Sequence, residues 1–86
     1  MPQISRFFGI VISMYFGDHN PPHFHAKYGE SEVLISLEDF SIIEGKFPQR
    51  ALSMVIEWAA LHKRELETNW QLVSEYKLPE KIEPLS

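Results

Sequence analysis

Hydrophobic and polar positions change their spacing once along the chain, near Pro48. Before this point, apolar residues occur in short runs that alternate with polar ones or fill both alternating positions, which is typical of β-strands. From residue 48 to about 76, apolar residues recur at steps of three, four or seven, as on one face of an α-helix. The pattern therefore predicts strands in the first half of the chain and a helix in the second.

Four strands are expected, at residues 4–16, 23–28, 32–37 and 42–44. The first is apolar on both alternating faces, which indicates a central strand or one covered on both sides. In the third, Val33, Ile35 and Leu37 share one face and should belong to the core. A tight reversal at Gly29 and Glu30 should join the second strand to the third.

One long helix is expected to start at Pro48 and run to about Tyr76, because no Gly or Pro interrupts this span. A kink near residues 62–64 would still fit the pattern. Residues 77–86 read as a polar tail, extended and partly ordered. The order β-β-β-β-α predicts an α+β fold, in which a small antiparallel sheet of about four strands packs against a long C-terminal helix.

Composition narrows the class of protein. A chain of 86 residues with 44% hydrophobic and 13% aromatic residues is expected to form one packed domain, residues 1–86. The absence of cysteine excludes disulfides and thiolate metal sites. A net charge of −4 counts against a general nucleic-acid-binding role, since such domains are usually basic. No run approaches the roughly 18–20 apolar residues of a membrane helix, so a cytoplasmic protein without a membrane partner is expected.

The segment from Gly17 to Tyr28, GDHNPPHFHAKY, holds three of the four histidines and two adjacent prolines. Strand alternation directs Phe24, Ala26 and Tyr28 towards the core. The other face of the same strand carries His23, His25 and Lys27. Asp18 and His19 belong to the preceding stiff turn, from which both would reach the same place. This row and its turn form the candidate site.

Three interpretations of this segment remain open. In the first, the turn is rigid and its histidines donate hydrogen bonds to loop carbonyls. In the second, a divalent transition metal is bound by imidazoles and a carboxylate, from Asp18, His19, His23 and His25. In the third, no metal is needed and the three histidines exchange protons, while Lys27 or Arg6 stabilises developing negative charge. The sequence favours the metal-free chemistry slightly over the metal, because one HxH pair on a strand is a weak metal signal.

Two further expectations lie outside this segment. His62 falls on the apolar stripe of the helix, where a hydrogen-bonded histidine at the edge of the core is the simpler interpretation. The short segment 38–45 would form a sheet edge on which a second copy of the chain could pair, so a homodimer is expected.

Three strings carry a family resemblance: PQISRFFGIVI, DHNPPHFHAKYGE and EGKFPQRALSMVIEWAALHKRELETNW. With them the chain, from Pro2 to about Leu85, resembles the small bacterial proteins of the domain of unknown function 4160 family. The motif positions are Asp18, His19, Pro22, His23, Phe24, His25, Arg50, Glu57, Trp58 and His62.

The resemblance implies a toxin of a two-gene toxin–antitoxin module, whose partner is the small protein encoded by the neighbouring gene. A toxin of this kind would act on RNA through the histidine-rich loop. The resemblance implies no established catalytic mechanism, so whether the protein is an enzyme stays open. The alternatives are a non-catalytic protein-interaction or regulatory module and a metal-binding protein that uses the same loop.

Overall fold

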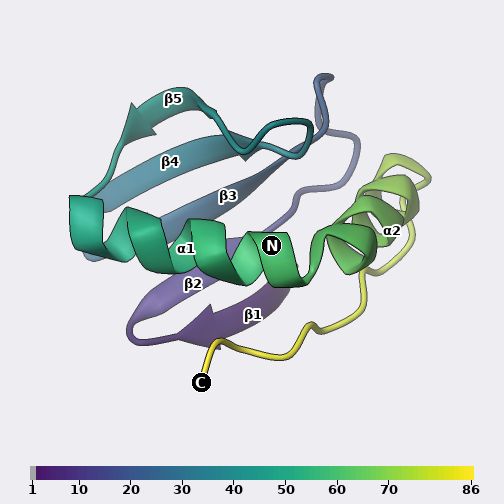
Figure 1. Cartoon of the computed structure of the whole chain (residues 1–86). Coiled ribbons are helices and arrows are strands. Elements are labelled where there is room, and N and C mark those ends of the chain that lie inside the picture. Colours follow the sequence, from purple (N-terminus) through teal and green to yellow (C-terminus); the bar gives the residue numbers. More distant parts are fainter. Residues whose placement is uncertain (1) are drawn as a thin grey trace.

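The computed structural model describes residues 2–86, which form a five-stranded antiparallel sheet and two helices (Figure 1). The strands are β1 (Gln3–Phe7), β2 (Ile10–Ser13), β3 (His23–Tyr28), β4 (Ser31–Ser36) and β5 (Ile42–Lys46). They lie in the sheet in chain order, each paired with the next. The helices, α1 (Gln49–Leu61) and α2 (Lys63–Ser74), follow the last strand. The predicted α+β class, with an antiparallel sheet followed by helical structure, is confirmed.

The segment predicted as the first strand, residues 4–16, contains two strands, β1 and β2. The sheet therefore has five strands, where about four were expected. A two-residue hairpin turn at Phe8 and Gly9 joins β1 to β2, and both residues have positive φ, +50° and +80°. Such turns match the right-handed twist of the flanking strands and favour glycine. The other turn position is Phe8, which is 60% exposed. Because Phe8 is apolar, the hydrophobic pattern of the sequence continues through the turn and gives no sign of it. The prediction of one strand over 4–16 was therefore wrong.

The core lies between one face of the sheet and α1, which crosses that face (Figure 1). Val33, Ile35 and Leu37 are buried there, as their alternation predicted. Trp58 of α1 packs against Phe7 and Phe24 of the strands, with ring centroids 5.4 and 6.0 Å away. Each fully buried side chain of this size stabilises the fold by roughly 1.5–3 kcal/mol.

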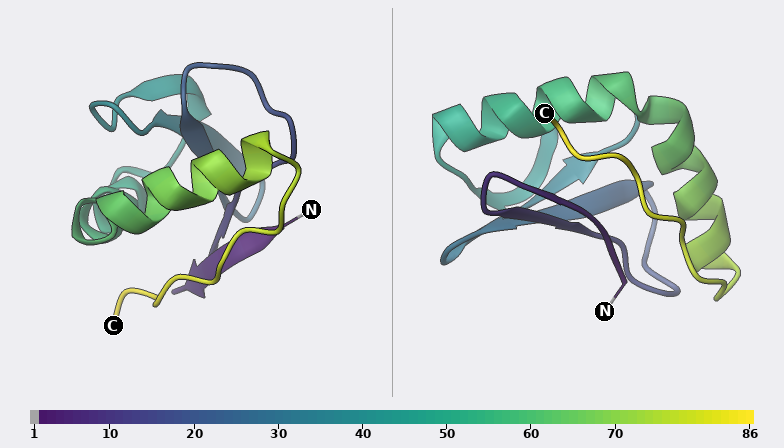
Figure 2. Two further views of the ribbon diagram at one scale, coloured as in Figure 1. Left: turned by 90° about the vertical axis from the view of Figure 1, so that its right-hand side faces the viewer. Right: turned by 90° about the horizontal axis from the view of Figure 1, so that it is seen from below.

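The predicted single helix breaks at His62, which has φ −122° and ψ 27°. A straight helix over residues 49–74 would be about 39 Å long, whereas the molecule's largest dimension is 33 Å. The break turns α2 around the end of the sheet, as both views in Figure 2 show, and keeps Leu66 and Val73 buried. In the described residues, neither helix is long and apolar enough to cross a membrane.

The polar tail, residues 77–86, runs back along β1 (Figure 2). The Ile82 N–H donates to the Ile4 carbonyl at 2.8 Å, and the Trp58 indole N–H donates to the Glu83 carbonyl at 2.8 Å. The side-chain amide of Asn69, which is 1% exposed, forms two hydrogen bonds of 2.8 Å with the backbone of Glu80. The tail is thus extended and held to both helices and to the β1 edge.

Candidate functional site

The segment between β2 and β3 reaches the end of α2, where the Gly17 N–H donates to the Val73 carbonyl at 3.1 Å. Gly17 has φ +64°, and a Cβ at this position would overlap the Tyr76 hydroxyl. The positive φ favours glycine here, and the exposed Tyr76 side chain would have to shift to admit a Cβ. The next residue, Asp18, turns back towards β3, and the His19 backbone N–H donates to its Oδ1 at 2.9 Å.

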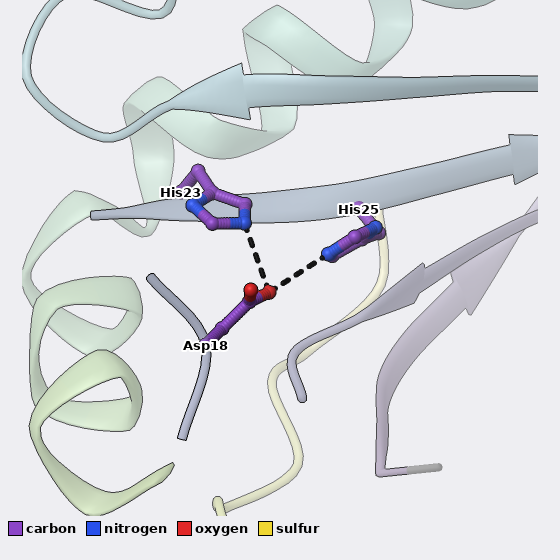
Figure 3. A group of neighbouring side chains, drawn as sticks. All are labelled: Asp18, His23 and His25. Atoms are coloured by element: carbon purple, nitrogen blue, oxygen red, sulfur yellow. Dashed lines mark hydrogen bonds and ion pairs between the residues drawn. The ribbon is translucent and has the colours of Figure 1, made fainter. Parts of the chain in front are cut away.

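Asp18 meets two histidines of β3 (Figure 3). These histidines alternate along the strand with Phe24 and Ala26 of the core, so they lie on the opposite face of the sheet. Its Oδ2 lies 2.9 Å from Nε2 of His23 and 3.1 Å from Nε2 of His25. One ligand atom from each of the three residues lies within 4.8 Å of the other two. The side chains are largely shielded from water, with exposed fractions of 21%, 6% and 15% for Asp18, His23 and His25.

The outward ring nitrogens of both histidines also face oxygen atoms. Nδ1 of His23 lies 2.7 Å from the Pro21 carbonyl oxygen. Nδ1 of His25 lies 3.5 Å from Oε2 of Glu32 and is buried without a hydrogen-bond partner. Each histidine thus turns Nε2 inward to one carboxylate oxygen and Nδ1 outward to an acceptor.

This arrangement limits the protonation states of His23. A carbonyl oxygen only accepts hydrogen bonds, so Nδ1 of His23 carries a hydrogen. In a neutral imidazole, Nε2 would then present a lone pair to the Asp18 carboxylate, which is also an acceptor. Either Nε2 is protonated and His23 is a buried imidazolium, or a cation lies between Nε2 and the carboxylate. The cluster has the chemistry of a metal site or of an acid–base pair.

The Asp18 carboxylate is ionised at neutral pH. Burial raises the pKa of Asp18, but the hydrogen bond from His25, the His19 backbone N–H and the charge and hydrogen bond of His23 outweigh it. The net effect holds the pKa of Asp18 below its usual value. A negative charge is therefore available between the two imidazoles, as either a metal or an imidazolium requires.

Two aromatic rings hold the imidazoles in place. The Tyr15 ring packs edge-on against His25 with a centroid distance of 4.3 Å, and the Trp70 ring of α2 lies 5.2 Å from His23. Burial raises the pKa of the Tyr15 phenol, and the charges of Glu32 and Asp18 raise it further. Tyr15 therefore remains a protonated hydrogen-bond donor beside the cluster.

The structure brings together three of the predicted site residues and leaves two outside. Asp18, His23 and His25 form the cluster, whereas the His19 side chain is exposed and only its backbone N–H contacts the Asp18 carboxylate. Lys27 is also exposed and lies opposite Glu32 in the sheet register. The functional roles predicted for all five residues remain predictions.

Glu32 is the neighbour that the sequence interpretation missed. Leu34 lies directly opposite His25, and Glu32 is two residues away on the same strand face. Diagonal neighbours of this kind are within reach of long side chains. The alternation of Glu32, Leu34 and Ser36 placed Glu32 on the outer face of its strand. Its contact with His25 could be predicted only with the register between β3 and β4.

A family model with the description "Domain of unknown function (DUF4160)" matches residues 9–71, which include the whole cluster. No curated protein and no solved structure matches the chain significantly. The match supports the resemblance found in the sequence motifs.

Proposed function

Because this chain belongs to the family described as a domain of unknown function, DUF4160, we propose its function from the site itself. Asp18, His23 and His25 bind one divalent transition metal ion, and this centre carries the activity of the protein.

The observation that carries the proposal is the orientation of the four ring nitrogens. Histidines that ligate metals almost always donate the hydrogen of the other ring nitrogen to a carbonyl or carboxylate, which leaves the inner nitrogen free for the metal. Here the Pro21 carbonyl and the Glu32 carboxylate occupy these outer positions, 2.7 and 3.5 Å from the two Nδ1 atoms. One cation would also remove the clash of lone pairs between Nε2 of His23 and Asp18.

The separations between the ligand atoms are slightly shorter than those that a metal requires. Ligands at about 2.0–2.2 Å from a metal lie roughly 3.3–3.6 Å from each other in tetrahedral geometry. The two nitrogen–oxygen distances to Asp18 are 2.9 and 3.1 Å. Small side-chain adjustments would therefore accommodate an ion.

Two imidazoles and one carboxylate leave coordination positions open, as in catalytic sites and unlike closed structural ones. This donor set suits Zn, Fe, Ni or Mn. Such a centre supports metal-assisted hydrolysis, with the protonated Tyr15 phenol placed beside His25 as a donor for substrate.

Metal binding by protein purified without a histidine tag tests the proposal. Elemental analysis and reconstitution with Zn²⁺ or Co²⁺ should give about one equivalent per chain, and Co²⁺ should give a visible ligand-field spectrum. Asp18→Asn and His25→Gln should lose both signals. Two control variants should keep them: His19→Ala, an adjacent exposed imidazole, and His62→Ala, whose ring hydrogen-bonds Glu65 at 2.6 Å outside the cluster. Wild-type protein that takes up no metal, or an Asp18→Asn variant that binds like wild type, would overturn the proposal.

The same contacts support a second candidate, metal-free acid–base catalysis. The hydrogen bond of 2.9 Å between Asp18 and His23 would orient and charge the imidazole, as in carboxylate–histidine pairs of enzymes. Metal-free wild-type protein with an activity that Asp18→Asn abolishes and chelators leave intact would favour this candidate.

For the biological role, we propose from the family resemblance a bacterial toxin of a two-gene module. Its substrate would be RNA, its partner the small protein encoded by the neighbouring gene, and its compartment the cytoplasm. Expression alone should arrest growth, Asp18→Asn should relieve the arrest, and His62→Ala should not. Normal growth of cells expressing the wild-type chain would refute this role. A complex with the neighbouring protein that survives Asp18→Asn and His25→Gln, without growth arrest, would favour a non-catalytic interaction module.

A further inference from the structure

A hollow of about 310 Å³ lies beside α2 and is lined in part by Trp70, whose ring centroid also lies 5.2 Å from that of His23. Its lining residues come from three parts of the chain: Pro22, Leu37, Glu38, Lys63, Glu67 and Trp70. The hollow is separate from the Asp18 cluster in its lining, and no step proposed above uses it.

The apolar part of the hollow contains an indole ring. Lys63, Glu67 and Trp70 follow each other along one face of α2 at steps of four and three, which places them in a row. Leu37 and Pro22 also line the hollow, and the Leu37 N–H donates to the Pro22 carbonyl at 2.9 Å. A partly buried Trp in a mostly apolar hollow suits a flat or cationic group, because the ring face is negative.

Three charged residues line the hollow, two acids and one lysine. Glu38 follows β4 and Glu67 belongs to α2, so the two acids come from different elements, and both residues are exposed. Among the ion pairs formed by residues 2–86, none involves either carboxylate. The Lys63 ammonium lies 5.8 Å above the Phe40 ring centroid, where a cation–π contact holds it.

We propose that this hollow receives an arginine side chain of a basic partner protein. The planar guanidinium stacks on aromatic rings and forms charged hydrogen bonds with carboxylates, and its stem covers apolar surface. The net charge of −4 on the chain attracts a basic partner over longer distances. A hollow of this size admits one long side chain rather than a folded segment.

The two tryptophans make the proposal measurable by NMR. The Trp70 indole lies at the hollow, whereas the Trp58 indole is fully buried and bonded to the Glu83 carbonyl. A seven-residue basic peptide with one central arginine should shift the Trp70 indole signal saturably and leave the Trp58 signal in place. The same peptide with citrulline, the neutral isostere of arginine, should bind at least about tenfold more weakly.

Variants and a competing ligand complete the test. The double variant Glu38→Gln/Glu67→Gln should weaken peptide binding about tenfold, and the Trp58 signal will report that it is folded. Glu57→Gln, an exposed acid of α1 outside the hollow, should bind like wild type. Equal binding of the arginine and citrulline peptides, no shift of Trp70, or full affinity in the double variant would each overturn the proposal. Tighter binding of spermidine than of the peptide would identify a site for a small polyamine and overturn the choice of a protein partner.

Discussion

Glu32 provides the sharpest test of how the candidate metal centre is built. Its Oε2 lies 3.5 Å from Nδ1 of His25, the only outward nitrogen of the two histidines without a hydrogen-bond partner in residues 2–86. With a metal bound, Nδ1 carries a hydrogen that the Glu32 carboxylate accepts, and the negative charge makes Nε2 a stronger ligand. Replacing Glu32 should therefore weaken metal binding without removing a ligand.

The expected magnitude follows from the exposure of Glu32. Loss of such supporting groups costs 10–100-fold in metal affinity, or about 1.4–2.7 kcal/mol. The Glu32 side chain is 47% exposed, so water screens its charge and the lower end applies. Glu32→Gln, which keeps an oxygen acceptor, should bind metal about tenfold more weakly, and Glu32→Leu, which loses the acceptor, should lie nearer the upper end.

Competition with a chromophoric chelator measures these affinities. The metal stoichiometry should stay at about one in both variants. The free energy of unfolding of the metal-free protein should change by less than about 0.5 kcal/mol, because Glu32 is a surface residue. Glu30→Gln, an exposed acid in the turn two residues earlier, is the matched control. An unchanged affinity in Glu32→Leu, or an equal loss in Glu30→Gln, would refute the assignment of Glu32 as a positioning residue.

Three other predictions concern the fold that supports the site. Ile82→Ala removes three carbons from a tail residue that is only 4% exposed. Its free energy of unfolding in urea should fall by about 2–3 kcal/mol. The exposed control Lys81→Ala should change it little, and equal effects of the two variants would mean that the tail does not pack as described. Gly17→Ala combines the strain of φ +64° with an overlap on Tyr76, so it should lower stability by at least about 1 kcal/mol and weaken metal binding; normal values for both would contradict the loop geometry. In the metal-free protein, the lowered pKa of Asp18 adds stability above its unfolded pKa of about 3.9. This stability is lost as the pH falls through the lower folded pKa. In urea titrations, wild type should therefore be more stable than Asp18→Asn at neutral pH, and the difference in free energy of unfolding should disappear in acid. A difference that does not change with pH would refute this role of Asp18.

Local patterns in the sequence determined much of the sheet and the placement of two of the three residues in the site cluster. The span of β3, the reversal at Gly29 and Glu30, and the buried face of Val33, Ile35 and Leu37 all follow from a period of two between apolar positions. The same alternation put His23 and His25 on one face of a strand, away from the core. These features depend on neighbours in the chain, so the order of residues was sufficient.

Tertiary structure decided the rest because it depends on contacts between distant residues. The kink that the pattern allowed near residues 62–64 is a full break at His62, without Gly or Pro, because α2 packs around the end of the sheet and buries Leu66 and Val73. Asp18 and His19 were equal candidates in one turn, and the anchoring of Gly17 to Val73 turns the carboxylate inward while the imidazole remains exposed. The sequence by itself thus determined that two imidazoles share a strand face, and the packing of the loop against α2 decided which third group joins them.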